Sequence, residues 1–291
     1  MGNLKLVKKH DLSAFRRIAI GTWTTPSDPS VYGTLTLRME QAQRYVDAFR
    51  RATGKRLTFS HMMAKAAAAV MVQCPDANAI LRWNRIYLRK RIGAFFQVAM
   101  EDSATGENDL SGAMIEDPEQ KSLSQLVDEF EAKTASVRSG QDRALESTRK
   151  MFKRIPFLLL NPLLKLIGFL SFTLNLDLRW MGVPRDPFGS VMITNIGSLG
   201  LEQAYVPLTP YSRVPLLVAT GAVVDAPVVE DGRVVVGKVM HICATFDHRV
   251  LDGTHAAAMA RIVRAWMEHP FEHFDAIPAR DEPARADQPQ A

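Results

Sequence analysis

The stretch FDHRVLDGTHAAAMARIVRAWMEHP, residues 246–270, sets one histidine between a strand and a helix. The preceding HICATF predicts a strand, and THAAAMARIV predicts a helix. His248 therefore lies at their junction, followed by Asp252 and by Gly253, which suits a tight turn. Because histidine titrates near neutral pH, His248 is a candidate general base for a thiol or a hydroxyl group. Asp252 could orient the imidazole, or brace the loop by pairing with Arg249 or another arginine. The alternative is a structural histidine in a loop.

The composition is that of a globular protein with a substantial core. Of 291 residues, 47% are hydrophobic, and the net charge is +5. No block of lysine and arginine is long enough to form a basic tail, so we predict no nucleic-acid partner. Cys74 and Cys243 have neither metal-ligand spacing nor a disulfide pattern, and the histidines show no metal spacing, so we predict no metal site. The cysteine usage and the lack of a signal-peptide pattern favour a cytoplasmic protein.

Helices and strands alternate along the chain, which predicts a mixed α/β domain. The expected strands are 32–39, 94–100, 190–196, 216–224 and 233–246, and the expected helices are 41–53, 60–75, 122–139 and 254–268. Asp231-Gly232 between two valine-rich runs predicts a tight hairpin, and Ser60 is the expected N-cap of its helix. Residues 276–291 are rich in proline, alanine and charge, which predicts a disordered tail.

One apolar stretch interrupts this pattern between Arg149 and Pro184. It opens with Arg149, Lys150, Lys153 and Arg154, and it is mostly apolar from Phe157 to Leu178. Internal prolines and charges argue against one clean membrane-spanning helix, which needs about 20 apolar residues. Three interpretations stay open: contact with a membrane or lipid, the cover of a pocket for an acyl chain, and packing inside the protein or an oligomer.

A second motif, FGSVMITNIGSLG, spans Phe188 to Gly200. It predicts a strand that ends in Thr194-Asn195, followed by a turn that contains glycine. A hydroxyl group at a strand end can donate a hydrogen bond to a developing oxyanion. Thr194 is therefore a candidate for that role, and the alternative is an ordinary β-branched strand residue.

DHRVLDG, MITNIGSLG and the order of the elements resemble the catalytic domain of the dihydrolipoamide acyltransferases of 2-oxoacid dehydrogenase complexes, relatives of chloramphenicol acetyltransferase. LSAFRRIAI, AFFQVAM and the segment from VPLLVATG to DHRVLDG extend the resemblance over nearly the whole chain. It implies an α/β two-layer sandwich of the chloramphenicol acetyltransferase type, with a mixed sheet and flanking helices. Residues 1–275 would form this catalytic domain, with the apolar stretch of about 149–184 as an insertion and residues 276–291 as the tail.

The resemblance also implies a chemistry and an assembly. The domain would be a homotrimer with active sites between subunits, where His248 of one subunit faces Thr194 of the next. His248 would deprotonate a dihydrolipoyl-type thiol, which attacks the thioester of acyl-coenzyme A. Thr194, where family members usually carry serine, would stabilise the oxyanion, and Asp252 would hold the loop that presents His248. Coenzyme A would be a substrate, and no residue is assigned to binding it.

The sequence departs from the family pattern in four places, so it does not determine the acyl group or the acceptor. We expect this chain to lack a lipoyl lysine, so a separate carrier protein or a small molecule would supply the acceptor. The polar stretch EDSATGENDLSGAMIEDP, residues 101–118, stands where the family has a Gly-Leu-x-x-Pro strand. The apolar insertion would emerge near the active-site channel, and the polar end of the chain favours a trimer over a cage. The alternatives are transfer to a hydroxyl or lipid-like acceptor and a non-catalytic trimeric scaffold.

Overall fold

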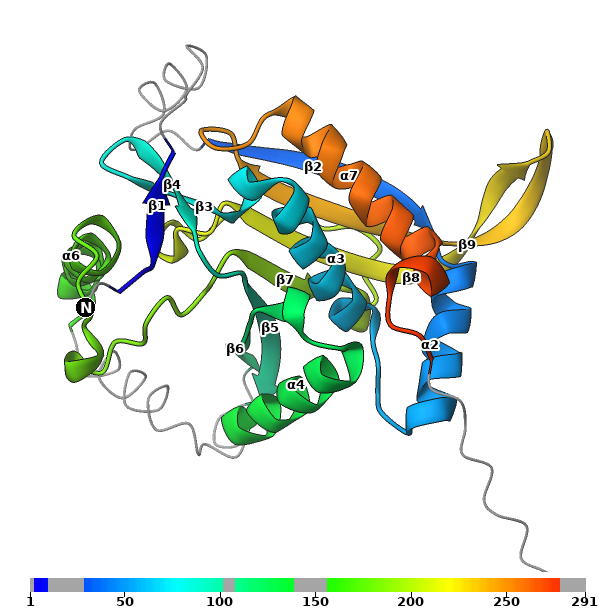
Figure 1. Cartoon of the computed structure of the whole chain (residues 1–291), viewed down its shortest axis with the longest axis horizontal. Coiled ribbons are helices and arrows are strands. Elements are labelled where there is room, and N and C mark those ends of the chain that lie inside the picture. The colour runs from blue at the N-terminus through cyan, green and yellow to red at the C-terminus, as the bar shows by residue number, and fades with distance from the viewer. Residues whose placement is uncertain (1–2, 10–28, 102–107, 139–155, 278–291) are drawn as a thin grey trace, which may run out of the picture.

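The computed structural model describes residues 3–9, 29–101, 108–138 and 156–277, and its centre is a six-stranded mixed sheet (Figure 1). In chain order its strands are β2 (Ser30–Arg38), β5 (Gly93–Glu101), β6 (Asn108–Glu116), β7 (Val191–Asn195), β8 (Leu216–Glu230) and β9 (Arg233–Asp247). They lie in the order β2-β9-β8-β7-β5-β6. β7 runs parallel to β5 and β8, and the other neighbours are antiparallel. The predicted mixed sheet is confirmed, and the tail prediction for 276–291 falls almost wholly outside the described residues.

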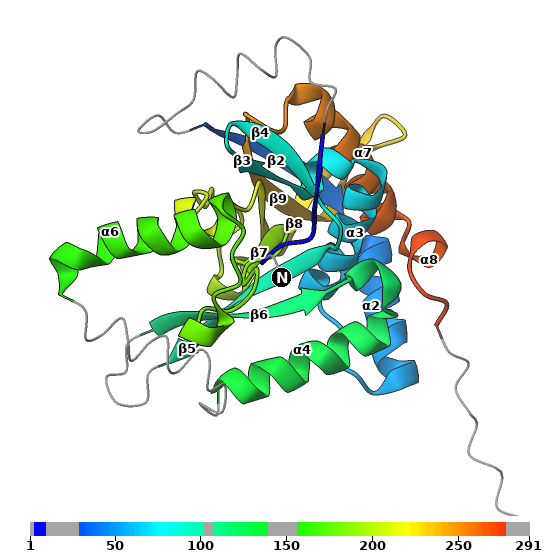
Figure 2. The same cartoon turned by 60° about the vertical axis from the view of Figure 1, so that its left-hand side comes forward.

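Helices cover one face of this sheet, as Figures 1 and 2 show from two sides. They are α2 (Glu40–Thr53), α3 (Phe59–Gln73), α4 (Leu123–Arg138), α7 (Gly253–Glu268) and the short α8 (Pro270–His273). The main core lies between the helices and the sheet, where Ile193 and Val218 pack in the same cluster as Met62 of α3. The opposite face buries Met192 and Leu217 against Val206 and Leu208, which belong to a loop. The architecture is therefore two layers, as predicted.

Helix α3 is apolar on nearly every side because it lies in the centre of the helical layer. It buries ten of its residues, including His61 and Lys65. The helix begins at Phe59, so its N-cap is Thr58 and the prediction of Ser60 is wrong. Thr58 has the extended backbone of a cap, whereas Ser60 already lies within the first turn. The backbone N–H of Thr58 donates to Nδ1 of His61 at 3.2 Å, which closes a capping box with histidine in the third position.

β8 and β9 form a hairpin around the two-residue turn Asp231-Gly232, as predicted. Both turn residues have positive φ, 48° and 75°, which is the backbone of a type I′ turn. Beyond residue 224 of β8 the two strands pair only with each other, so the hairpin projects from the body of the molecule (Figure 1). Val229, Val234 and Val236 on this projection are 71%, 73% and 79% exposed.

A small second sheet carries the apolar insertion. Its strands are β1 (Leu6–Lys8), β3 (Ala79–Arg82) and β4 (Arg85–Arg89), in the order β1-β4-β3. The insertion forms α6 (Phe157–Gly168) and a π-helical turn, η3 (Phe169–Thr173). Phe172 of that turn is buried against Leu4 and Ile80 of the small sheet. Among the described residues, no helix has the length and apolar character needed to cross a membrane.

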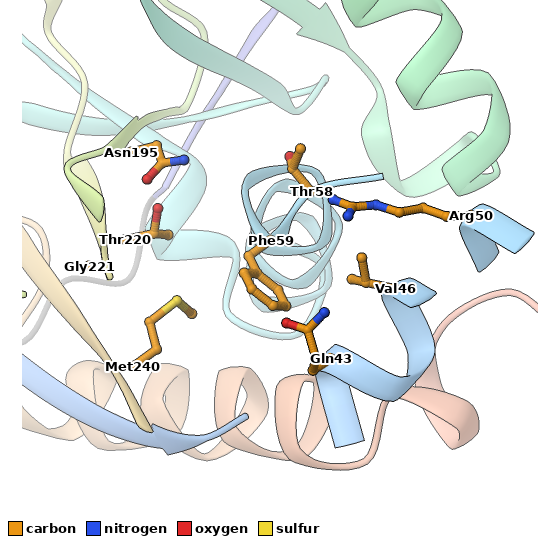
Figure 3. A pocket seen from close by; sticks show the side chains of 9 residues that line it. All are labelled: Gln43, Val46, Arg50, Thr58, Phe59, Asn195, Thr220, Gly221 and Met240. Carbon is orange, nitrogen blue, oxygen red and sulfur yellow. The ribbon is translucent and has the colours of Figure 1, made fainter. Parts of the chain in front are cut away.

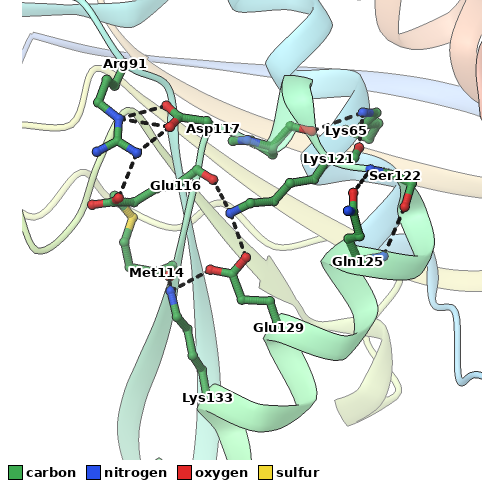
Figure 4. Close-up of polar contacts among 11 residues, drawn as sticks. Lys65, Arg91, Met114, Glu116, Asp117, Lys121, Ser122, Gln125, Glu129 and Lys133 are labelled. Carbon is green, nitrogen blue, oxygen red and sulfur yellow. Dashed lines mark hydrogen bonds and ion pairs between the residues drawn. The ribbon is translucent and has the colours of Figure 1, made fainter.

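Within the polar stretch of residues 101–118, Asn108–Glu116 form an edge strand, β6, which was not predicted from the sequence. A dense set of polar contacts follows this strand (Figure 4). The ammonium group of Lys65 donates to the carbonyl oxygens of Pro118, Glu119 and Lys121. Three N–H donors thus meet three carbonyls, which satisfies a lysine whose pKa burial lowers. This cage fixes the turn between β6 and α4 against α3.

His61 makes the stability of the fold depend on pH. The side chain is 2% exposed beside Phe96 and Phe130, and burial, followed by the charges of Arg50 and Arg56, lowers its pKa to about 4. The unfolded chain then binds a proton below pH 6.5 that the folded chain accepts only near pH 4. We expect the free energy of unfolding to fall across this window by up to about 3 kcal/mol.

Urea denaturation at several pH values between 4 and 7 measures this loss. His61→Gln removes the titrating group, and glutamine in the third helical position can still accept the Thr58 N–H. The variant should therefore lose less stability as the pH falls. Equal slopes for the variant and the wild type would show that other groups carry the dependence.

Candidate functional site

His248 lies in the turn directly after β9, where the strand leaves the sheet. Its backbone N–H donates to the carbonyl oxygen of Pro29 at 2.9 Å, which fixes the turn to the residue before β2. Its Nδ1 lies 2.9 Å from the carbonyl oxygen of Leu251. A carbonyl oxygen only accepts, so Nδ1 must carry the proton in this bond and the lone pair is on Nε2. The turn therefore selects the tautomer that a general base at Nε2 requires.

The turn itself is held by Asp247, which was not predicted as a site residue. Its backbone carbonyl accepts from the N–H groups of Val250 and Leu251, at 3.0 and 2.8 Å. Its carboxylate binds the guanidinium of Arg249, with the closest approach 2.7 Å. Both side chains are partly shielded from solvent, so the pair is screened less than a surface pair. The only sequence signal for this brace is that an acid and a base flank His248.

Arg213 is a second cation near this brace that the sequence analysis missed. Burial and the charge of Arg249 lower the pKa of Arg213, and the Asp247 carboxylate opposes that shift. Arg213 has a positive φ of 56°, in the loop directly before β8. The charge of Arg213 therefore interacts with those of Arg249 and Asp247, close to His248.

Asp252 is the N-cap of α7. One carboxylate oxygen accepts from the N–H groups of Thr254 and His255, at 3.0 and 3.1 Å, and lies 2.7 Å from Nδ1 of His255. Nε2 of the same imidazole lies 3.2 Å from Asp76. Asp252 thus satisfies two backbone donors that a helix start leaves without partners. It also fixes the end of the loop that begins at His248.

Thr194 lies near the end of β7, which β8 separates from β9, the strand that leads to His248. Side chains alternate along a strand, and Ile193 faces the helical layer, so Thr194 faces the other side with Met192. The turn after Thr194-Asn195 needs glycine because two backbones meet there. A Cβ on Gly197 would lie 2.5 Å from the carbonyl oxygen of Gly221. This close approach explains the Asn-Ile-Gly pattern that follows Thr194.

Within one chain the structure does not bring His248 and Thr194 together. Thr194 pairs with Ala219 of β8, whereas Phe246, two residues before His248, pairs with Leu216. The two side chains are therefore about five residue rises apart along the sheet and two strand spacings across it, roughly 19 Å. A hydrogen bond or a shared substrate atom is impossible at that separation.

A small cavity opens at the end of β7, on the helical side of the sheet (Figure 3). Asn195, Thr220 and Met240 line it from the sheet, and Arg50 and Phe59 line it from the helices. Its volume is about 140 Å³, whereas ligand pockets usually have about 300–1,000 Å³. Neither His248 nor Thr194 lines it. This cavity therefore does not bring the candidate catalytic residues together, and among the described residues no cluster of side chains could hold a metal ion.

The segment that carries both motifs matches a known protein family. Residues 188–274 match the model of the 2-oxoacid dehydrogenases acyltransferase (catalytic domain). Residues 188–274 of the chain belong to this acyltransferase family. Relatives of the chain include the lipoamide acyltransferase component of a branched-chain alpha-keto acid dehydrogenase complex of Pseudomonas putida. That protein is 37% identical over 83 residues, which are 28% of this chain and 19% of the relative. The chain spans less than half the length of the curated relatives that it matches.

Solved structures extend the likeness in fold to most of the chain. A probable dihydrolipoamide acetyltransferase of Listeria monocytogenes superposes with a TM-score of 0.63 at 16% identity, covering 94% of this chain and 99% of that one. The cubic core of a pyruvate dehydrogenase multienzyme complex superposes with a TM-score of 0.61 at 18% identity, covering 89% and 88%. The chloramphenicol acetyltransferase-type fold predicted from the sequence is confirmed.

The capping role of Asp252 predicts how its substitution changes stability. Asp252→Ala removes the acceptor of two backbone N–H groups at the start of α7, and we expect the free energy of unfolding to fall by about 1–2 kcal/mol. Asp252→Asn keeps an acceptor oxygen in that place and should stay close to the wild type. Urea denaturation measures both. An equally large loss in the asparagine variant would mean that the charge beside His255 matters more than the cap.

Proposed function

We propose that this domain transfers an acyl group between coenzyme A and a dihydrolipoyl-type thiol. In the forward direction Nε2 of His248 takes the proton of the acceptor thiol, and the thiolate attacks the carbonyl carbon of the acyl-coenzyme A thioester. The tetrahedral intermediate collapses as the bond to the coenzyme A sulfur breaks, and His248 returns its proton to that sulfur. The hydroxyl group of Thr194 donates to the oxyanion of the intermediate. No covalent bond to the protein is needed.

The observation that carries this proposal is the hydrogen bond between Nδ1 of His248 and the carbonyl oxygen of Leu251. A histidine with only a structural role could adopt either tautomer. Here the turn selects the one with a basic Nε2, within the segment that matches the acyltransferase family. The brace of Asp247 and Arg249 holds the backbone that makes this bond.

We further propose that the active site forms between subunits of a homotrimer. The separation of roughly 19 Å within one chain leaves the Thr194 of a neighbouring copy as the partner of His248. The projecting β8–β9 hairpin supports such contacts, since a two-stranded ribbon with exposed valines is marginally stable by itself. Three identical heterologous contacts around one axis give a closed trimer.

We also propose that the domain forms single trimers and that these trimers do not join into a larger cage. Phe274, near the end of the described chain, is 7% exposed and packs on Tyr45 and Trp266 of its own subunit. It is therefore occupied within the fold, whereas Phe271 is 53% exposed. We also propose the domain limits 1–275, and a separate carrier protein as the source of the acceptor thiol.

The first test is the loss of acyl transfer in His248→Ala. Without a general base we expect the rate with acyl-coenzyme A and dihydrolipoamide to fall by about 10² or more. Acylated dihydrolipoamide counted by mass spectrometry measures it, since the number of thiols does not change in this reaction. His269→Gln, a substitution of an exposed histidine at the end of α7, is the matched control. An unchanged rate in His248→Ala would exclude His248 as the base.

The second test asks whether two subunits build each site. His248→Ala and Thr194→Ala should each be nearly inactive as pure trimers. Random mixing of the two should restore about a quarter of the wild-type rate, because roughly three quarters of the trimers contain both variants and each of those has one intact site in three. Subunits refolded together from urea, with separately refolded samples as the control, provide the measurement. No recovery in trimers shown to be mixed would contradict the shared site.

A further inference from the structure

The positive charge of this protein is concentrated in one part of the fold. We define the basic lobe as residues 3–9, 79–91 and 156–186, which contain the small sheet, the described part of the apolar insertion and the residues next to them. They contain eleven lysines and arginines and two aspartates, a net charge of +9. The whole chain carries +5, so the remainder carries −4. Lys5, Arg85, Lys90 and Lys165 are exposed, and no carboxylate pairs with them among the described residues.

The same lobe exposes large apolar side chains. Helix α6 has one charged residue in the sequence FLLLNPLLKLIG, yet Leu159 and Leu166 are 57% and 53% exposed. Trp180, in the segment that follows, is 80% exposed. A helix that is apolar on all sides is normally covered by protein or by a membrane. In Figure 2, α6 extends away from the body on the side of the sheet opposite the helical layer.

The cations and the apolar side chains meet at one place. Trp83 lies at the tip of the β3–β4 turn, between Arg82 and Arg85, and is 57% exposed. Its ring contacts the ring of Phe169, with centroids 5.8 Å apart. Phe169 follows Lys165 by one helical turn, so the two side chains lie on the same face of the helix. An exposed aromatic pair is thus flanked by cations from two segments far apart in the sequence.

We propose that the basic lobe docks this domain on the surface of a lipid bilayer that contains anionic lipids. Tryptophan favours the interface between headgroups and hydrocarbon, leucine favours the hydrocarbon, and lysine and arginine meet the anionic headgroups. With twelve residues α6 is about 18 Å long. It therefore lies along the surface rather than across the membrane. A second copy of the lobe is a poor partner, because it brings the same net charge of +9.

Vesicle binding by the full chain tests this docking and does not depend on acyl transfer. We expect co-sedimentation with vesicles of phosphatidylcholine and phosphatidylglycerol, little with pure phosphatidylcholine, and weakening as the salt concentration rises. Binding should shift tryptophan emission to the blue. Trp83→Asn with Trp180→Ser should abolish that shift, and asparagine tolerates the positive φ of 52° at position 83.

Two double variants with the same change of charge distinguish binding through the basic lobe from a general attraction of the protein to anionic vesicles. Arg85→Glu with Lys165→Glu should lower the partition coefficient about tenfold or more. Arg44→Glu with Arg51→Glu makes the same change of charge on exposed residues of α2 and should bind nearly as the wild type. Circular dichroism confirms that each variant is folded.

Three outcomes overturn the proposal. The first is that the protein binds neutral and anionic vesicles equally, or binds neither. The second is that the two charge-reversed double variants lose vesicle binding equally. The third is that the tryptophan double variant changes in native mass. The last would identify the lobe as a contact between copies of the chain.

Discussion

The antiparallel pairing of β9 with both β2 and β8 is the constraint on which the rest of this domain depends. It holds β9 in the sheet up to Asp247, so that the chain must turn at His248. The backbone N–H of His248 donates to the carbonyl oxygen of Pro29, the residue before β2. The imidazole of His248 donates through Nδ1 to the carbonyl oxygen of Leu251. The same pairing sends β7 and β8 away from that end of the sheet, which places Thr194 far from His248. The geometry that creates the candidate base therefore also separates it from its partner within one chain.

Long periodic segments and strong turn signals could be predicted from the sequence. The hairpin at Asp231-Gly232 and the helix that ends at Gly54 are clear because a positive φ favours so few residues, and Gly54 has a φ of 71°. The position of His248 between a strand and a helix was predicted correctly for another reason: the β-branched and aromatic residues before it give way to an alanine-rich run after it. In these segments local preference and tertiary structure agree.

Other features depend on contacts between distant residues, which a single sequence does not display. β6 was missed because only Ala113 and Ile115 among its described side chains are buried, since an edge strand has a core on one side. β3 and β4 are short and carry arginines, and their role depends on packing against Phe172, some 90 residues later. The ion pair of Asp247 and Arg249 could not be predicted from the sequence for another reason. Any acid close to a basic residue in sequence could form such a pair, and only the backbone of the turn selects this one.

The proposed threefold symmetry and the proposed docking of the basic lobe constrain each other. A rotation axis relates the subunits of a cyclic trimer, so all three lobes point to the same side of any plane perpendicular to that axis. A flat surface perpendicular to the axis is then the one surface that three lobes can touch together. Each lobe would bind weakly by itself, but after the first contact the other two are held near the surface at a high effective concentration. Their binding energies combine in that geometry, whereas lobes directed to the sides of the trimer would bind one at a time. Weak docking by a monomer and firm docking by a trimer would then be consequences of one arrangement, in which the contacts proposed to complete the active site also determine the strength of membrane binding.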